Sequence, residues 1–432
     1  MNHRLFDDEK RQITQKLTIR MKEMKKLMLS ASAVLALGSV SSVAMADEGF
    51  SVFSNTKFNG EIRPRYENVD VDNSGKKQAN AYTVRATIGM ESTLFGVDGL
   101  TVKIDGTTVQ EIGGNNFNSS ANGLSGYELV KDPEQSRFSQ LYLQYKMGNT
   151  TAKAGKQIVN LDNQRFVGSV DWRQMMQSFE AAVLSNTSIP GLTLIGGYVW
   201  GVDGIGNTPT AETDSVLFNG SYKVNDTLKI TAYDYMISST HDTVGAALTG
   251  VIPAAGAKVD YRAEYAVQGD ASRDTDGGTV NAQADAYYYN LEATATMNGV
   301  IAGVGYEFLS GTSGSDGKSA FSTPLATLHK FNGWADIFLT TPTGGLVDTS
   351  LTLGYGAAGL GKAMVVYHDF ETDVAMSGKS DLGSEWDMMY TNAIPGIKGL
   401  NGLIKAAYFN GGDVAGKTAD VRKVWLQLDY KF

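Results

Sequence analysis

Cationic side chains that alternate with carboxylates are the residues of this sequence best suited to chemistry. They recur in short segments, at Arg63, Arg65, Arg85, Lys103 and Arg262, beside Glu61, Glu67, Glu91, Asp105 and Glu264. Such a row would attract anions if it lined an aqueous passage. The same residues could instead brace the protein through ion pairs and solvated charge, which contribute little individually. Both interpretations stay open for each residue.

Two longer segments combine cationic, aromatic and apolar side chains. Residues 158–172 contain Arg165, Phe166 and Trp172, and residues 320–336 contain Pro324, His329, Lys330, Phe331 and Trp334. Large apolar side chains are unfavourable on a loop that extends into water. We expect both segments to fold into the interior of a larger structure and to narrow it. The alternative is that they pack together as a lid.

Two matches to nucleotide-binding motifs lack the sequence context that such a site needs. Residues 354–359 match GxGxxG and residues 356–362 match GxxxxGK, but Ala363 replaces the Ser or Thr that would hold magnesium. Both matches overlap a tight turn between strands, and no helix follows to offer its amino terminus to a phosphate. Nucleotide binding is therefore not expected.

Metal sites and catalysis lack a supporting pattern as well. Asp70 and Asp72 imitate the start of a calcium loop, but Ala81 occupies the final acidic position. His241, His329 and His368 lie on separate elements, and no nucleophile motif surrounds the last two, which are the plausible bases. We predict no enzyme activity, no cofactor and no metal.

The elements that must position these residues are two-faced β-strands. In the last segment, apolar side chains at Val424, Leu426, Leu428, Tyr430 and Phe432 alternate with Lys423, Trp425, Gln427, Asp429 and Lys431. Successive side chains of a strand point to opposite faces, so one face is apolar and the other mostly polar. The same alternation recurs around residues 57–67, 82–91 and 258–268. A closed transmembrane barrel needs this pattern in every strand.

The amino terminus predicts export. Lys22, Lys25 and Lys26 precede an apolar stretch, residues 27–43, which ends in small residues before Asp47. This order is typical of a secretory signal peptide, so residues 1–46 are expected to be a leader and cleaved signal, and residues 47–432 a single barrel domain. The excluded part carries eight Lys/Arg and four Asp/Glu, which leaves 29 and 42 and a formal charge of −13. Nucleic acid is therefore an unexpected partner. The chain has no cysteine, so disulfides contribute nothing.

The connections between strands alternate in length. Short links at residues 148–149, 225–226 and 298–299 are separated by long polar ones at residues 70–79, 113–133, 204–213, 310–323, 371–381 and 410–417. Clear segments alone give an odd number of strands. Counting residues 241–251 as one more strand, with a turn through residues 253–256, restores the alternation. The sequence then predicts an all-β fold, an antiparallel transmembrane barrel of about 18 strands with short periplasmic turns and long outer loops, some folded into the pore.

Residues 154–181 and 320–336, together with this layout of strands, resemble the alginate-export family of outer-membrane porins, and most of all its porin-like branch. The resemblance covers nearly all of residues 58–432 and implies an 18-stranded, monomeric barrel with a basic-lined pore. Lys156 stands where the family has arginine, and lysine lacks the planar fork that clamps carboxylates.

We therefore expect an outer-membrane porin of a Gram-negative-type bacterium. It would let small hydrophilic solutes, anions among them, diffuse passively through a water-filled pore. The alternative is an export channel for an anionic polysaccharide such as alginate, and a lesser alternative is a soluble exported adhesin or lectin. Arg63, Arg65, Arg85, Lys103, Arg262, Glu61 and Glu264 would line the pore. The expected partners are membrane lipid, the solutes and the outer-membrane assembly machinery, for which Tyr430 and Phe432 would form the recognition signal.

Overall fold

The computed structural model describes residues 51–114, 116–273, 283–313 and 318–432. The predicted leader and signal peptide lie outside these residues. None of the helical segments in the described part of the chain could span a bilayer.

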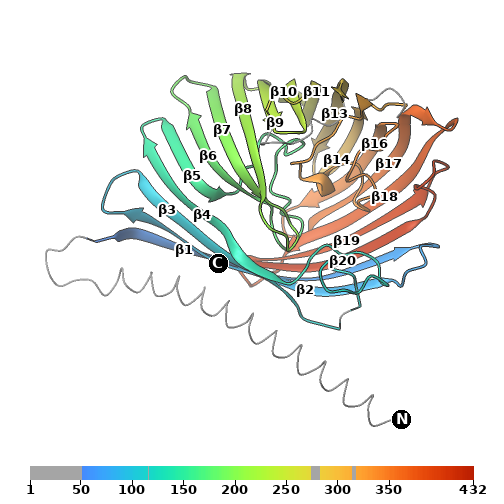
Figure 1. Ribbon diagram of the computed structural model, residues 1–432, viewed down its shortest axis with the longest axis horizontal. Coiled ribbons are helices and arrows are strands. Elements are labelled where there is room, and N and C mark those ends of the chain that lie inside the picture. Colours follow the sequence, from blue (N-terminus) through green and yellow to red (C-terminus); the bar gives the residue numbers. More distant parts are fainter. Residues whose placement is uncertain (1–50, 115, 274–282, 314–317) are drawn as a thin grey trace, which may run out of the picture.

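Within the described residues, eighteen strands form one antiparallel sheet that closes on itself (Figure 1). Each strand pairs with its neighbours in chain order, and the last pairs with the first, from Glu61 opposite Lys431 to Val71 opposite Val421. Closure means that no strand lies at an open edge of the sheet. The prediction of an antiparallel barrel of about 18 strands is confirmed. The strands of the wall are β1 (Phe53–Val71), β2 (Ala79–Leu94), β3 (Leu100–Glu111), β4 (Gln135–Met147), β5 (Thr150–Gln157), β6 (Ser178–Asn186), β7 (Leu192–Asp203), β8 (Ala211–Asn225), β9 (Leu228–Ile237), β10 (His241–Ala254), β11 (Ala257–Gly269), β13 (Ala286–Met297), β14 (Val300–Leu309), β16 (Leu346–Ala357), β17 (Gly361–Met376), β18 (Lys379–Ala393), β19 (Leu400–Gly411) and β20 (Val421–Lys431).

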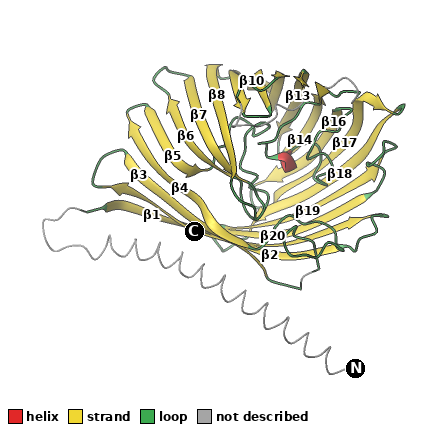
Figure 2. Cartoon of the chain, in the orientation of Figure 1, coloured by secondary structure: helices red, strands yellow, loops and turns green. Residues whose placement is uncertain are grey.

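Two short elements lie outside the wall sheet. β12 (Gln283–Ala284) and β15 (Lys318–Ser319) form a separate parallel pair. A single turn of 3-10 helix, η1 (Leu328–Lys330), lies inside the barrel and is drawn in red in Figure 2.

The alternation of side chains sets the two faces of the wall. On β20, Leu426 is 46% exposed on the outer face, whereas the neighbouring Trp425 is completely buried on the inner face. On β11, Tyr265 is exposed and Glu264 is buried in the same way. The outer surface is therefore apolar and the inner surface polar, as a bilayer requires of a barrel.

The links between strands follow the predicted alternation in most places. The link between β9 and β10, residues 238–240, is short although it lies on the side of the long links. The link predicted at residues 371–381 is instead a strand hairpin, because β17 continues to Met376 and β18 begins at Lys379. Its tip, Ser377 and Gly378, has φ values of 54° and 78°. Positive φ at both central residues is the geometry of a tight hairpin turn, which lets the two strands extend beyond their neighbours.

Pro64 is accommodated inside β1. The pairing of β1 with β20 covers Ile62 and Arg65 but omits Arg63 and Pro64. Proline has no backbone N–H, so it cannot donate to a ladder on that side.

The main hydrophobic cluster includes Phe321 of a loop as well as wall residues, so it lies inside the barrel, where loops pack against the wall.

Candidate functional site

Two segments of chain run inside the barrel (Figure 1). We call residues 158–177, between β5 and β6, inner loop 1, and residues 320–345, between β15 and β16, inner loop 2. The two loops are joined by backbone hydrogen bonds from Gly168 N–H to Leu325 O at 2.9 Å and from Thr327 N–H to Gln164 O at 3.0 Å. They therefore form one connected body in the interior.

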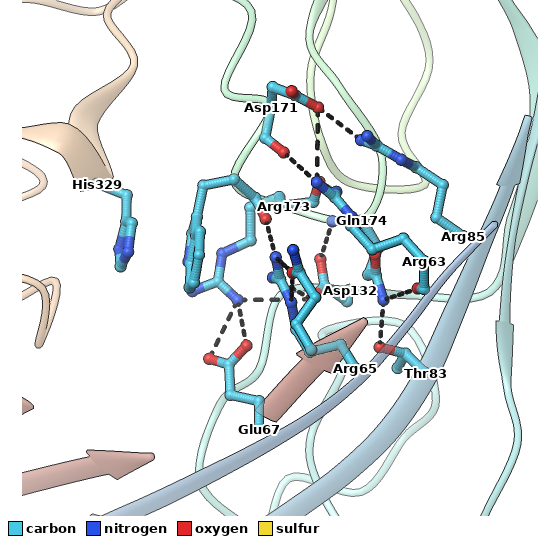
Figure 3. Close-up of polar contacts among 12 residues, drawn as sticks. Arg63, Arg65, Glu67, Thr83, Arg85, Asp132, Asp171, Arg173, Gln174 and His329 are labelled. Carbon is cyan, nitrogen blue, oxygen red and sulfur yellow. Dashed lines mark hydrogen bonds and ion pairs between the residues drawn. The ribbon is translucent and has the colours of Figure 1, made fainter. Parts of the chain in front are cut away.

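Arg63 of β1 holds the end of inner loop 1 (Figure 3). Its Nε donates to Gln174 Oε1 at 3.1 Å, and its terminal nitrogens donate to the backbone carbonyls of Asp171 at 2.9 Å and Arg173 at 2.6 Å. The side chain is 4% exposed. All three nitrogens of this guanidinium are thus directed at the loop.

Arg65 and Arg85 extend the same attachment. Arg65 donates to the carbonyl of Trp172 at 2.6 Å, and Arg85 donates to Asp171 Oδ1 at 2.7 Å. Arg85 also pairs with Glu61 on the neighbouring strand. Burial alone would raise the pKa of the Asp171 carboxyl, but the Arg85 and Arg63 guanidinium groups outweigh burial and lower that pKa. Three predicted pore-lining arginines therefore face inward, and all three donate hydrogen bonds to inner loop 1.

Arg173 belongs to inner loop 1 and binds carboxylates of the wall and of inner loop 2. It binds Glu67 of β1 at 3.1 Å and Asp336 of inner loop 2 at 2.9 Å, and Asp132 lies 3.7 Å away. Burial would lower the pKa of this guanidinium, but the three carboxylates outweigh that effect and raise it. Arg65 lies 3.8 Å from Asp132 and Lys423 lies 3.4 Å from Asp336. With these two further cations, the cluster fits the rule that buried charges are paired.

His329 joins the two loops to β19. Its ring stacks on Trp172 with centroids 4.3 Å apart. Its Nδ1 lies 2.6 Å from Asp336 Oδ1, and its Nε2 lies 2.7 Å from Lys405 Nζ. A lysine ammonium can only donate, so Nε2 accepts and Nδ1 carries the proton that is donated to Asp336. Burial, reinforced by the Lys405 charge, outweighs the Asp336 carboxylate and lowers the pKa of His329 well below its ordinary value, which favours the neutral imidazole.

The Lys405 ammonium is enclosed by indole rings. It lies 4.2 Å from the ring centroid of Trp172, 3.7 Å from that of Trp334 and 5.6 Å from that of Trp425. Aromatic faces attract a cation, and the attraction is larger when water is excluded. One wall lysine thus contacts Trp172 of inner loop 1 and both His329 and Trp334 of inner loop 2.

A second anchor fastens inner loop 1 on the opposite side. The Nε of Arg165 donates to Glu307 Oε1 of β14 at 2.7 Å, and its Nη2 lies 3.3 Å from Oε2. The guanidinium also lies over the ring of Phe331, 4.8 Å from its centroid. Phe166 packs 5.1 Å from the ring of Tyr233 on β9. The aromatic and cationic residues predicted to form a constriction thus lie together in the interior.

A polar chamber of about 230 Å³ lies between inner loop 2 and the wall strands β13 to β17. Lys330, Phe331 and Trp334 line it from the loop. Its wall side carries the carboxylates Glu292, Glu307 and Asp348 and the imidazole of His368. His368 Nδ1 lies 2.8 Å from Asp348 Oδ1, so this second histidine is held by a carboxylate.

The remaining predicted pore residues are ion-paired at separate places. Arg262 binds Asp162 of inner loop 1 at 2.8 Å and Glu264 on its own strand at 2.7 Å. Lys103 binds Asp105 at 2.9 Å, away from both loops. The described residues contain no cluster of three or more His, Asp or Glu arranged to hold a metal.

Sequence reasoning missed several residues that hold the loops in place. Lys405, Asp336, Gln174 and Asp132 gave no signal, because each is a single polar residue in an ordinary strand or loop context. Trp425 gave one: it is an aromatic residue on the otherwise polar face of the last segment. A large apolar side chain on an inward face implies something inside the barrel for it to pack against.

Solved structures share this fold. OccK8 (OprE) of Pseudomonas aeruginosa aligns with a TM-score of 0.67 and 17% identity, over 88% of this chain and 99% of its own. OccAB4 of Acinetobacter baumannii gives 0.68 and 16%, over 88% and 98%. OpdK of P. aeruginosa, solved with vanillate, gives 0.68 and 13%, over 89% and 100%. No protein-family model matches the sequence, and no curated protein matches it. At these identities the likeness establishes the barrel fold.

Proposed function

We propose that this protein is an outer-membrane porin through which small hydrophilic solutes diffuse passively. The observation that carries the proposal is a closed barrel, apolar outside and polar inside, with two loops anchored in its interior. An apolar outer face suits lipid, and loops inside a barrel of this size restrict what passes. The fold is that of OpdK, an outer-membrane protein whose structure has been solved with vanillate.

The charge preference of the pore depends on which charged side chains in the interior are free to meet a solute. Arg63, Arg65 and Arg85 are buried and directed at the carbonyls and carboxylates of inner loop 1. We infer that they position this loop, and their attraction of anions stays a prediction. The chamber under inner loop 2 offers more carboxylates than cations, which favours solutes that donate hydrogen bonds.

Recording from the purified protein in planar bilayers tests the function. Stepwise conductance increases on insertion are expected, and reversal potentials in a salt gradient give the charge preference. A protein that fractionates in the soluble extract, or that inserts without conducting, would refute the proposal.

The narrower sequence predictions remain predictions. Membership of the alginate-export family, and alginate export with it, rests on the resemblance of residues 154–181 and 320–336 alone, since no family model matches. A monomeric state and recognition of Tyr430 and Phe432 by the assembly machinery belong to the same proposal. A soluble adhesin or lectin is disfavoured by the apolar outer surface.

A further inference from the structure

A tripeptide of tyrosine, lysine and an apolar residue occurs three times in the sequence, and each copy lies at the end of a wall strand. The copies are residues 145–147 of β4, 222–224 of β8 and 430–432 at the end of β20. All three strands run toward the side of the barrel on which the short links lie. The third copy contains Tyr430 and Phe432, the two residues proposed above as the assembly signal.

The side chains of the three copies point in the same directions. The tyrosine and the apolar residue are exposed on the outer face in each, namely Tyr145 and Met147, Tyr222 and Val224, and Tyr430 and Phe432. Successive residues of a strand face opposite sides, so the lysine between them points to the lumen. The outer faces continue with Leu141 and Leu143, with Phe218, and with Leu426 and Leu428. Each strand end therefore presents apolar side chains at the same spacing.

The same backbone contact holds the three strand ends. The lysine N–H donates to the carbonyl of a glycine in a neighbouring link, from Lys146 to Gly99 at 2.9 Å, from Lys223 to Gly191 at 2.8 Å and from Lys431 to Gly399 at 3.0 Å. These glycines have φ values of 80°, 80° and 85°. A Cβ on them would lie 2.1, 3.0 and 2.2 Å from the carbonyl oxygen of the same lysine, so the close approach favours glycine. The three copies thus share a local structure as well as a sequence.

An aromatic girdle explains the tyrosines but not the residues that follow them. Barrels carry aromatic side chains at both membrane interfaces. Tyr355 of β16 and Tyr390 of β18 lie near strand ends on the same side and are exposed like the others. They are followed by Gly356 and Thr391 in place of lysine. A girdle tyrosine therefore does not require the tripeptide, and its repetition indicates a further role.

We propose that the ends of β4 and β8 are internal docking segments for the outer-membrane assembly machinery, equivalent to the segment at the end of β20. The inference rests on the proposed recognition of Tyr430 and Phe432. Before the barrel closes, a receptor can add any of these strands to the edge of its own sheet through backbone hydrogen bonds, with pockets for alternate side chains. The tyrosine and the apolar residue of each copy fill the same two pockets. Several such segments on one chain strengthen binding without any new contact.

The order of the strands gives the internal segments a use. The wall closes when β1 pairs with β20, where Glu61 lies opposite Lys431, so closure waits for the last strand. Until then the growing sheet has open edges, which can pair with other chains. β4 and β8 precede β20 in the chain, so a receptor can bind them before the last strand arrives. Docking at these segments keeps the incomplete barrel at the membrane during that interval.

Photo-crosslinking of the full chain tests the proposal. Benzoylphenylalanine is placed at residue 145, 222, 430 or, as the matched control, 390, and the chain is assembled into bacterial outer membranes that contain the machinery. The four tyrosines replaced are 44%, 46%, 36% and 42% exposed, so their accessibility in the finished barrel is similar. Adducts with the machinery during assembly are expected at the first three positions, about tenfold above the control, the scale of one lost anchoring contact.

Alanine variants separate recognition from stability. Tyr145→Ala with Met147→Ala should slow the gain of heat-modifiable mobility by about tenfold, and the corresponding pair in β8 should do the same. Met388→Ala with Tyr390→Ala is the control, because both side chains are exposed on the outer face of β18, and its assembly rate should equal that of the wild type. Once folded, the β4 variant and the control should unfold at the same temperature.

The possible outcomes distinguish the internal segments from the terminal one. Adducts at 430 without adducts at 145 and 222 overturn the inference and leave the terminal signal standing. Adducts at 145 and 222 without adducts at 430 support the inference and remove Tyr430 and Phe432 from the proposed signal. Equal adducts at all four positions, or slow assembly in the control as well, overturn the inference in favour of a girdle. None of these measurements depends on conductance, so they are independent of the proposed porin activity.

Discussion

The indole of Trp172 and the imidazole of His329 stack face to face, with centroids 4.3 Å apart and planes 5° from parallel. Trp172 belongs to inner loop 1 and His329 to inner loop 2, so the stack joins loops that are far apart in sequence. The guanidinium of Arg65 lies 4.2 Å from the same indole. This contact is therefore one of those that join the two loops in the lumen.

Replacing Trp172 by Ala should widen the passage. The substitution removes the stack with His329 and one wall of the cage around Lys405. Truncating a fully buried Trp costs roughly 3–5 kcal/mol, and the partly buried Trp172 should cost less. Single-channel conductance should rise and fluctuate between levels. Trp200→Ala is the control, because Trp200 lies on β7 and is 37% exposed. A steady conductance equal to that of the wild type would contradict the role of the stack.

Acidic pH should loosen the inner loops. The pKa of His329 is held well below the ordinary 6.5 in the closed structure, and it returns toward 6.5 if the loops open. Below pH 6.5 His329 binds a proton in the open state but not in the closed state. The contribution of His329 to the stability of the closed loops is therefore complete above that pH and is lost as the pH falls toward the depressed pKa. Conductance recorded from neutral to acidic pH should become noisier in the wild type, and the transition should disappear in His329→Gln. Asp336, Lys405 and Arg173 surround the ring, and an unchanged transition in the variant would assign it to another group.

Breaking the Arg165–Glu307 pair should destabilise the folded barrel. Both side chains are buried, and removing one partner leaves an unpaired charge at a cost of about 3–5 kcal/mol. Glu307→Gln and Arg165→Met should each lower the temperature at which the protein loses its folded mobility on gels. The double variant should recover part of the loss. Asp214→Asn, which breaks the exposed pair with Arg273, is the control and should leave the temperature unchanged.

Replacing Arg63, Arg65 and Arg85 together by Ser separates two roles for the arginine row. Hydrogen bonds to a charged group contribute about 1.5–3 kcal/mol each, so their loss should release the end of inner loop 1. We expect a fluctuating, larger conductance with a modest shift in reversal potential. Lys103→Ser is the control, since Lys103 pairs with Asp105 away from the loops. A quiet channel that has lost anion preference would instead establish the row as an anion path.

Deleting Phe432 should reduce barrel assembly more than conductance. Its backbone pairs with Gly60, N–H to O at 3.1 Å and O to N–H at 2.8 Å, and its ring lies where a Cβ on Gly60 would collide. Gly60→Val should therefore displace the ring and reproduce part of the defect. Gly356→Val, whose added carbon meets only ordinary contacts, is the control. The amount of heat-modifiable protein in membranes reports assembly. Normal assembly of the deletion variant would remove Phe432 from the proposed signal.

The number of strands and the face to which each side chain points could be predicted from the sequence, because both depend on local spacing. Alternation has a period of two, so Glu264 and Tyr265 had to point to opposite faces whatever their partners. The hairpin at residues 377–378 was missed, because polar residues near a strand end look the same in a loop and in a strand that extends into water. The inward path of residues 158–172 was foreseen as one of two options, from aromatic residues that a water-exposed loop would not carry.

The sequence by itself determined a two-faced barrel of about 18 strands and the inward direction of Arg63, Arg65 and Arg85, and it predicted which residues narrow the interior. Only the tertiary structure decided what those side chains contact. Arg63 reaches Asp171, 108 residues away, and His329 meets Lys405, 76 residues away. Alternation fixes the face of a side chain, because it is a property of neighbouring residues. The partner depends on how the closed wall places distant segments in one lumen, which no local pattern records.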